Sequence, residues 1–346
     1  MPGDGIGQEI MDATIQVLTK ISEQYNHAFI FEQHEIGGSA YDKYGEPLTD
    51  ETVNACLSAD AILLGAIGGE KWDSLPPHLR PEQGLLKIRK ALSLFANIRP
   101  IKGFAPLIHA SPLKEDVIKG SDIYIVRELT GGLYFGTPRE RRDNGNVAVD
   151  TLLYHRNEIE RIVEKGFESA RLRNKHLTSV DKANVLESSR LWREIVEEKS
   201  KEYPDVTVDH LLVDSAAMKL ITDPTSFDVI VTENMFGDIL SDEGSVLTGS
   251  IGMLPSASLS ETVGLYEPVH GSAPDIAGKG IANPMGMILS AAMMLRYSFN
   301  LNEEANVIEQ AVEKSLEQGF HTADLKIDNG KQVSTKEMTD VIISNL

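Results

Sequence analysis

The stretch that decides the fold reads Asn234-Met235-Phe236-Gly237-Asp238-Ile239-Leu240-Ser241-Asp242-Glu243, directly after the apolar run Phe227-Asp228-Val229-Ile230-Val231-Thr232. The apolar run is typical of a buried strand, and the stretch behind it has the spacing of a helix. A helix that opens at the carboxyl end of a buried strand lies where α/β proteins gather their ligands. The stretch therefore predicts α/β architecture with a ligand site at this strand end.

Two carboxylates of this stretch predict a metal site. Asp238 and Asp242 are four residues apart, so a helix presents both on one face, where they repel each other unless a cation lies between them. The alternative is a solvated acidic stripe, the common fate of such residues. Ile239 and Leu240 between the carboxylates and the glycine-rich stretch Gly244 to Gly252 argue against a merely exposed face. We therefore favour a divalent metal.

Length and charge bound the class of protein. A chain of 346 residues exceeds one ordinary core, so two domains are expected. The 52 acidic and 33 basic residues give a formal net charge of −19, which repels nucleic acid and anionic lipid surfaces. We expect neither as a partner. An anionic substrate would need a local cluster of arginines to overcome this charge.

The single cysteine and the lengths of the apolar segments indicate in which cellular compartment the protein is found. Cys56 alone excludes an intrachain disulfide and fits a reducing cytoplasm, and a small buried hydrophobe is its simplest role. The amino terminus lacks a signal pattern, and the longest apolar stretch, Pro284 to Leu295, is too short to span a bilayer. We expect a soluble, cytoplasmic protein without membrane partners.

Apolar periodicity along the chain supports the α/β prediction. A helical period runs from Gln8 to Ile21, directly after the glycine turn Gly3 to Gly7. Short apolar runs at Phe29 to Phe31, Ala61 to Ala66 and Ile123 to Arg127 predict strands. Buried parallel strands alternating with helices follow from this order.

Two local signals predict further elements. Arg142 to Asn146 carries an Asn-Gly turn signal, and Val147 to Tyr154 reads as a strand behind it, so we expect a hairpin that could serve as an oligomer arm. Ser334 and Glu337 form a capping-box pattern, which predicts the start of the last helix.

Three arginines are candidates for binding an anion: Arg89, Arg99 and Arg127. The guanidinium fork suits carboxylate recognition. Taken singly, each fits a surface or structural ion-pair residue better, because arginine is common on helices and at strand ends. Arg127 stands out because it ends a predicted buried strand at the carboxyl end, where a charge usually faces a cleft.

Tyr134 and Lys182 could be an acid/base pair, because a lysine and a tyrosine can both exchange protons in catalysis. The alternatives, an exposed lysine and a half-buried core tyrosine, are favoured by the residues alone. Asp214 is ambiguous between a helix N-cap and a third carboxylate ligand.

Two glycine-rich segments compete as phosphate-binding loops. The first, Gly3 to Gln8, differs from a dinucleotide fingerprint, because its third glycine comes one residue early and no strand precedes it. The second, Glu267 to Pro284, has small residues that allow close backbone approach, a histidine, and an acid able to hold a pair of ribose hydroxyls. A purely structural loop is the alternative.

Taken together, the segments resemble the metal-dependent β-decarboxylating dehydrogenases, the isocitrate and isopropylmalate dehydrogenase family, over nearly the whole chain. The most specific segments are Leu85 to Pro100, Val126 to Gly136, Asn234 to Asp242 and Glu267 to Pro284. The resemblance implies a two-domain α/β fold that is not of the Rossmann type, with open mixed sheets and a dimer arm. It implies a discontinuous cofactor-binding domain at 1–94 plus 249–346, and a substrate, metal and dimerisation domain at 95–248.

The resemblance also implies roles at the site. The three arginines would clamp the malate carboxylates, Tyr134 and Lys182 would act as acid/base residues, and Mg²⁺ or Mn²⁺ would be held by Asp214, Asp238 and Asp242, with Asp214 also near the substrate. The adenosine half of the cofactor would be lined by His270, Gly271, Ser272, Ala273, Pro274, Asp275, Ile276 and Asn283, with Glu267 at the start of the segment. A carboxylate at Asp275 would repel a 2′-phosphate, so NAD is expected.

Substrate choice would depend on Glu82, Leu85 and Leu86. The paired leucines suit an isopropyl group, and burying the γ-carboxylate of isocitrate against them without a partner would be costly. The resemblance thus implies oxidative decarboxylation of 3-isopropylmalate to 4-methyl-2-oxopentanoate with NAD reduction, in leucine synthesis. The alternatives are another 2-hydroxy diacid, such as isocitrate, homoisocitrate or tartrate, or a non-catalytic regulatory subunit.

The resemblance further implies a homodimer with shared sites, in which one subunit supplies Asp238 and Asp242 and the other supplies Lys182 and Asp214. One departure concerns the amino terminus. Family members begin with an apolar strand before the glycine turn, whereas only Met1 precedes that turn here. Either the start lies upstream or the first domain lacks a strand.

Overall fold

The computed structural model describes residues 1–346, which form two compact units, each described here by itself. Unit 1 comprises Met1–Leu94, Phe104–Pro112 and Ser245–Leu346, and unit 2 comprises Phe95–Gly103 and Leu113–Gly244. Both units contain helices and strands, as the α/β prediction requires. Which unit binds the cofactor and which binds the substrate remains a prediction.

The strands of unit 1 lie in the order β1, β10, β9, with β1 parallel to β10 and β10 antiparallel to β9. A separate parallel pair is formed by β11 and β12. The elements are α1 (Gly7–Tyr25), α2 (Gly38–Tyr44), α3 (Asp50–Ser58), β1 (Ile62–Leu63), α4 (Pro81–Ala91), β9 (Pro255–Leu259), β10 (Gly264–Pro268), α10 (Met285–Tyr297), α11 (Asn302–Glu317), β11 (Phe320–His321), β12 (Lys331–Gln332) and α12 (Thr335–Asn345).

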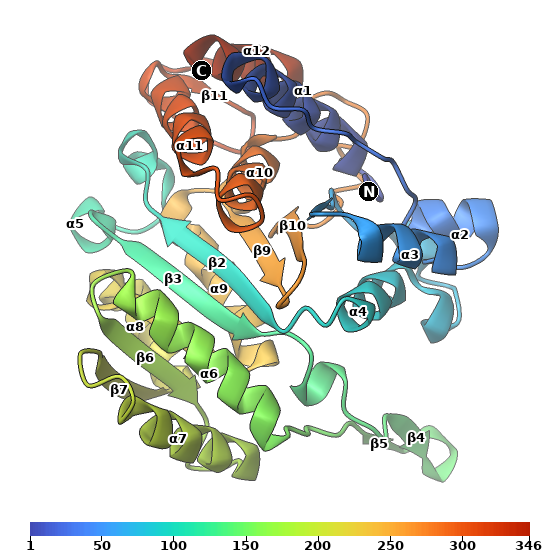
Figure 1. Ribbon diagram of the computed structural model, residues 1–346, viewed down its shortest axis with the longest axis vertical. Coiled ribbons are helices and arrows are strands. Elements are labelled where there is room, and N and C mark those ends of the chain that lie inside the picture. Colours follow the sequence, from blue (N-terminus) through green and yellow to red (C-terminus); the bar gives the residue numbers. More distant parts are fainter. The chain divides into compact units, whose positions relative to one another are not determined.

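Helix α10 forms the centre of unit 1. Every residue from Met285 to Leu295 is buried, because the helix is apolar on all sides and other elements surround it. Helices α1 and α11 and strands β9 and β10 pack around it (Figure 1). The apolar stretch that the sequence showed at Pro284 to Leu295 is therefore a core helix.

The two end helices of unit 1 confirm their sequence signals. The helix predicted from Gln8 to Ile21 is α1, which buries the face containing Ile10, Leu18 and Ile21. The capping box predicted at the last helix is present at α12, where Ser334 Oγ accepts the Glu337 N–H and the Glu337 carboxylate accepts the Ser334 N–H.

The strand predicted at Phe29 to Phe31 is wrong. These residues belong to no strand and pair with none, and Ile30 is 89% exposed. Phe29 contacts the ring of Phe299 instead, with 6.2 Å between the ring centroids. The run from Ala61 to Ala66 contains a strand, but only its residues Ile62 and Leu63 belong to β1.

Unit 2 has strands in the order β2, β3, β8, β6, β7. Strand β2 runs antiparallel to β3, and the others run parallel, so the sheet is mixed. Helices α6 and α7 cover the near face of these strands in Figure 1. The elements are β2 (Ala96–Lys102), α5 (Glu115–Ile118), β3 (Asp122–Glu128), β4 (Glu140–Arg142), β5 (Val147–Val149), α6 (Arg156–Arg171), β6 (His176–Asp181), α7 (Glu187–Ser200), β7 (Thr207–Leu212), α8 (Val213–Thr222) and β8 (Val229–Thr232).

The strand and helix predicted from the deciding stretch are both present. The strand is β8, whose four residues are buried, and the helix is α9 (Asn234–Thr248). In the register of β3 and β8, Arg127 lies opposite Thr232. Arg127 therefore ends its strand at the edge where α9 begins, which places a cation beside the two predicted metal ligands.

The predicted hairpin is also present. Strand β4 pairs antiparallel with β5 across a turn in which Asp143, Asn144 and Gly145 all have positive φ. Figure 1 shows this ribbon extending from unit 2 as an arm. The second strand ends at Val149 rather than at Tyr154, because no partner strand continues beside it, and Tyr154 is buried.

Candidate active site

The carboxylate of Asp238, near the start of α9, accepts hydrogen bonds from a guanidinium group and from a tyrosine hydroxyl. The Arg127 guanidinium donates from Nη1 to Asp238 Oδ1 at 2.5 Å. The Tyr134 hydroxyl donates to the other oxygen of Asp238 at 2.6 Å. Arg127 is only 1% exposed, so its charge is held in a fixed place. The structure thus joins three of the predicted site residues directly.

A second buried arginine reaches the same helix from β2. Arg99 Nη1 donates to Ser241 Oγ at 2.6 Å and to Asp242 Oδ1 at 3.3 Å, and its Nη2 lies 3.4 Å from Asp238 Oδ1. Its Nε donates to Asn97 Oδ1 at 2.8 Å. Two guanidinium groups and two carboxylates therefore lie together in unit 2, and their formal charges cancel.

Asp238 and Asp242 lie on one face of α9, as their spacing predicted. Burial and the neighbouring charge of Asp238 raise the pKa of Asp242, while Arg99 opposes this rise. The side chains of Asp238 and Asp242 are 31% and 56% exposed, so their oxygens remain open to solvent. Open carboxylate oxygens are the ligands that Mg²⁺ and Mn²⁺ prefer. No third acidic or histidine side chain of the chain joins them in a possible metal cluster.

The predicted base and the third predicted metal ligand form a separate pair. Lys182 follows β6, Asp214 lies in the first turn of α8, and the Lys182 ammonium donates to the Asp214 carboxylate. This hydrogen bond holds the pKa of Asp214 below its ordinary value. The N-cap of α8 is Leu212, so the alternative role of Asp214 as an N-cap is wrong. The register of β6 and β7 brings the two residues together, because Asp181 lies opposite Leu212.

In unit 1, four predicted substrate residues share one face of α4. Glu82, Leu85, Leu86 and Arg89 follow the i, i+3, i+4, i+7 spacing of a helical stripe. The two leucines are half-buried and Glu82 is exposed. Arg89 is buried and donates from Nη2 to Glu267 Oε1 at 2.8 Å, which ties α4 to β10. Its Nε is buried without a hydrogen-bond partner.

The predicted cofactor loop is attached to unit 1 by the glycine turn near the amino terminus. The Ile6 N–H donates to the Ser272 carbonyl oxygen at 2.8 Å, and the Ser272 hydroxyl donates to the Gly68 carbonyl oxygen at 2.8 Å. Gly5 has a φ of +57°, and a Cβ there would lie 2.0 Å from the Ser272 carbonyl oxygen. The glycines of this turn therefore permit close packing against the loop.

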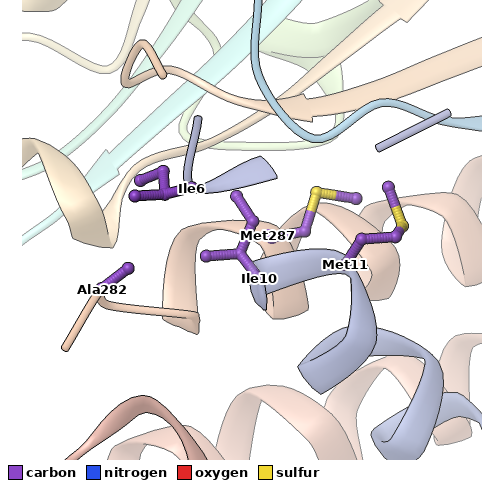
Figure 2. Packing of buried hydrophobic residues seen from close by; sticks show 5 residues of the cluster. All are labelled: Ile6, Ile10, Met11, Ala282 and Met287. Atoms are coloured by element: carbon purple, nitrogen blue, oxygen red, sulfur yellow. The ribbon is translucent and has the colours of Figure 1, made fainter. Parts of the chain in front are cut away.

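An apolar cluster anchors the same loop from below. Figure 2 shows Ile6, Ile10, Met11, Ala282 and Met287 packed together, with contributions from α1 and α10.

The half-buried side chains of Ala273, Ile276 and Ala277 pack against this cluster. Ile276 therefore serves as an apolar anchor, whereas Gly271, Pro274 and Asp275 are exposed beside it. The loop combines a fixed base with an open outer edge.

Two further residues of the loop, His270 and Asn283, differ in whether their side chains can still form a hydrogen bond. His270 bonds the Gly271 carbonyl oxygen through Nδ1 at 2.8 Å, and its Nε2 is buried without a partner. Burial lowers the pKa of His270, so the neutral ring leaves Nε2 as an acceptor. Asn283 instead donates to Asp324 at 3.0 Å and accepts the Met285 N–H at 2.9 Å.

One residue of the deciding stretch has a role that sequence reasoning missed. Asn234 accepts from Arg127 twice with its side-chain oxygen, at 2.8 Å from Nη2 and 3.2 Å from Nε, and its carbonyl oxygen accepts from Nε at 2.8 Å. Its position at the helix start, just behind a strand that neighbours Arg127, was the signal that could have found it.

Comparisons with known proteins identify the family of the chain. A family model described as isocitrate/isopropylmalate dehydrogenase matches residues 1–342. The chain belongs to this family. It is 70% identical over 347 residues to a 3-isopropylmalate dehydrogenase of Oceanobacillus iheyensis, covering 100% of this chain and 94% of that protein. It is also 58% identical over 348 residues to a 3-isopropylmalate dehydrogenase of Aquifex aeolicus, and this match covers 100% of this chain and 96% of that protein.

Solved structures of the family confirm the predicted fold class. An isocitrate dehydrogenase of Methylococcus capsulatus has a TM-score of 0.88 at 34% identity, with 99% of this chain and 97% of that chain covered. A β-decarboxylating dehydrogenase of Thermococcus kodakarensis in its apo form has a TM-score of 0.80 at 38% identity, and this match covers 99% of this chain and 94% of that chain. The chain is therefore an enzyme of the β-decarboxylating dehydrogenase type. None of its helices combines the length and apolar character needed to cross a membrane.

Proposed function

We propose that the chain oxidatively decarboxylates 3-isopropylmalate to 4-methyl-2-oxopentanoate with reduction of NAD, as a step of leucine synthesis in the cytoplasm. The observation that carries the substrate is the face of α4, where half-buried Leu85 and Leu86 lie in one stripe with buried Arg89. A leucine pair favours an isopropyl group over a second carboxylate, whose burial there would lack a partner.

The arginines would bind the two carboxylates of the malate part. Arg99 and Arg127 are 6% and 1% exposed, and charge-assisted hydrogen bonds to carboxylates are the strong ones in such desolvated places. Arg89 retains a buried Nε–H without a partner, which a substrate oxygen would satisfy. These local charges would overcome the net charge of −19.

The metal would be held by Asp238 and Asp242 of one copy and by Asp214 of a second copy. Two solvent-open carboxylates on one helix face fit such an ion, and Asp214 of the same chain does not join them in a group of three ligands, so a second copy would supply it. When bound, Mg²⁺ or Mn²⁺ supplies a Lewis acid at the C2 oxygen.

Tyr134 and Lys182 would move the protons. Lys182, as the neutral amine, would take the proton of the C2 hydroxyl, and the ammonium formed would be stabilised by the Asp214 carboxylate, with which it makes an ion pair in this chain. The Tyr134 hydroxyl would donate a proton to the carbon that loses CO₂, and Asp238 holds this hydroxyl in one direction. Each residue would thus serve a different half of the reaction.

The cofactor would be bound by the loop Glu267 to Pro284, and bound NAD supplies the hydride acceptor. His270 Nε2 is a buried acceptor without a partner, which suits a ribose hydroxyl. Exposed Asp275 would repel a 2′-phosphate and so favour NAD over NADP.

A homodimer would complete the site. Large apolar side chains of unit 2 are exposed at Val185, Met218 and Ile239, which are 61%, 64% and 57% exposed. Met218 lies on α8 and Ile239 on α9, the helices that contain Asp214 and Asp238. A second copy that covers these side chains would bring the third carboxylate of its own chain to the pair on α9.

A spectrophotometric assay tests the function. NADH formation should be fast with 3-isopropylmalate and Mg²⁺ or Mn²⁺, slow with isocitrate and tartrate, and absent after exhaustive chelation until the metal is restored. The Asp238→Asn variant should not turn over. Higher activity on isocitrate, or full activity in chelated protein, would contradict the proposal.

The shared site has its own test. Lys182→Ala and Asp238→Asn are each expected to be inactive, but mixed dimers would contain one intact and one doubly defective site. Random mixing in equal amounts makes about half of the dimers mixed, so roughly one quarter of the sites should recover. Mixed dimers confirmed by native mass spectrometry yet without activity would rule the shared site out.

A further inference from the structure

Tyr154 lies directly against the turn that carries Tyr134. A Cβ added at Gly131 would lie 2.7 Å from Cε1 of the Tyr154 ring, and one added at Gly132 would lie 2.5 Å from the Tyr154 hydroxyl. The Gly132 N–H also donates to the carbonyl oxygen of Leu153 at 3.0 Å. The two glycines therefore allow the turn to rest on this ring, two residues before the predicted acid.

The ring of Tyr154 is fixed by its own surroundings. It is 8% exposed and meets Trp192 edge-on, with 6.2 Å between ring centroids and 70° between the planes. The position of the ring thus depends on packing, and the hydroxyl is available for a further role.

The Tyr154 hydroxyl connects two separate segments. It accepts the N–H of Asn234, the first residue of α9, at 3.0 Å, and it interacts with the buried carboxylate of Glu128. That carboxylate accepts from the Thr130 N–H at 2.7 Å, the Thr130 hydroxyl at 2.9 Å and the Gly131 N–H at 2.9 Å. Glu128 and Tyr154 together therefore hold the end of β3, the turn and the start of α9.

Asn234 connects these hydrogen bonds to Arg127, and through Arg127 to Asp238 and Tyr134. Its side-chain N–H donates to the Gly131 carbonyl oxygen at 3.2 Å, while its side-chain oxygen accepts from Arg127. Arg127 in turn binds Asp238, the residue that accepts the Tyr134 hydroxyl. Every link from Tyr154 to Tyr134 is a hydrogen bond or a tight packing contact within unit 2.

We propose that Tyr154, held by Glu128, is a positioning residue for Tyr134. Its hydroxyl fixes the start of α9 against the Gly131-Gly132 turn, so that the Tyr134 hydroxyl and Asp238 stay in hydrogen-bonding contact. The inference rests on the proposed role of Tyr134 as the acid. Loss of the Tyr154 hydroxyl leaves the Asn234 N–H and the Glu128 carboxylate without this partner, and both segments gain freedom where the proton is delivered.

The test compares Tyr154→Phe with a matched variant, Tyr203→Phe. Tyr203 is also a buried tyrosine of unit 2, its hydroxyl donates to Glu164, and its ring stacks on Phe167. We expect Tyr154→Phe to lower kcat about tenfold with a much smaller change in the KM for isopropylmalate, as one lost hydrogen bond to a charged group implies. Tyr203→Phe should leave kcat unchanged. A wild-type kcat in Tyr154→Phe would overturn the inference.

A double variant separates positioning from general damage. If Tyr154 acts through Tyr134, adding Tyr154→Phe to Tyr134→Phe should slow the enzyme no further. Effects that multiply would show that Tyr154 acts independently of Tyr134 and would also overturn the inference.

The experiments distinguish a failure of the proposed acid, Tyr134, from a failure of the positioning role of Tyr154. Full activity in Tyr134→Phe would contradict the proposed acid itself, whereas an impaired Tyr134→Phe beside a wild-type Tyr154→Phe would contradict only the positioning role. If thermal unfolding shows that Tyr154→Phe does not fold, Glu128→Gln takes its place. That variant keeps an acceptor for Thr130 and Gly131, and it carries the same expected loss of kcat and the same refuting result.

Discussion

Substitution of Gly237 by alanine offers a sharp test of the arginine clamp. Gly237 lies in the first turn of α9, and a Cβ there would lie 2.6 Å from Arg127 Cγ and 2.8 Å from its Cβ. Ordinary contact begins at 3.4 Å, so Cγ has to retreat by about 0.8 Å. The near end of the side chain cannot rotate away, because the guanidinium is bound by Asn234 and Asp238.

The expected effect on stability is a balance of two terms. Alanine is preferred over glycine within a helix by roughly 0.5–1 kcal/mol, whereas overpacking of a tight site costs roughly 1–3 kcal/mol. The crowding should win, and Gly237→Ala should unfold at a lower temperature than the wild-type protein. Weakening of one charge-assisted hydrogen bond to substrate would lower kcat/KM roughly 10- to 100-fold.

Gly244→Ala is the matched control on the same helix. Its Cβ would come within 2.4 Å of Ile101 Cδ1 only, the far end of a flexible side chain, and the other near atoms lie at 3.5 Å or beyond. We expect near wild-type kcat/KM for this variant in the steady-state NADH assay. If Gly237→Ala also keeps wild-type stability and kcat/KM, the argument that Arg127 is locked in place is wrong.

Three further predictions concern substrate, stability and cofactor. Leu86→Ser should weaken isopropylmalate catalysis by about 1–3 kcal/mol, and an unchanged ratio of isopropylmalate to malate activity would refute its contact with the isopropyl group. Burial, with the charge of Glu128, raises the pKa of Glu233 from 4.5 to about 7, so the folded protein keeps a proton that the unfolded chain releases. The free energy of unfolding should therefore fall as pH rises through this window, and the melting temperature of Glu233→Gln relative to wild type should increase from pH 5 to pH 8; a constant difference would contradict it. Asp275→Lys should shift kcat/KM towards NADP, and adding Ile276→Tyr should extend the shift but lower the melting temperature, because Ile276 packs on the core; a wild-type enzyme that already prefers NADP would contradict the assignment.

The sequence predicted those parts of the fold that depend on neighbours along the chain. Strand β8, helix α9 and the capping box at Ser334 follow from periodicity and from side chains three or four residues apart. Phe29 to Phe31 has the composition of a strand, but a strand needs a partner beside it, and none is present. Local composition cannot report that absence.

The sequence predicted which residues form the site, but only some of the contacts between them. The aspartates on one face of α9 follow from their spacing, whereas the hydrogen bond between Tyr154 and Asn234 joins residues 80 positions apart. Tyr154 has no local signal, because its role arises when the turn and the helix meet. The pairing of Lys182 with Asp214 likewise depends on the register of two strands.

The arm formed by β4 and β5 gives a way to observe assembly without measuring catalysis. A two-stranded ribbon is marginally stable alone, and the first strand is exposed and contains Arg141 and Arg142 beside Arg139. Trypsin cleaves behind arginine in accessible chain, so an uncovered arm should be nicked before either compact unit. If the proposed dimer covers the arm, dilution below its dissociation constant should speed cleavage at these arginines, and the rate of cleavage would then measure how stable the dimer is.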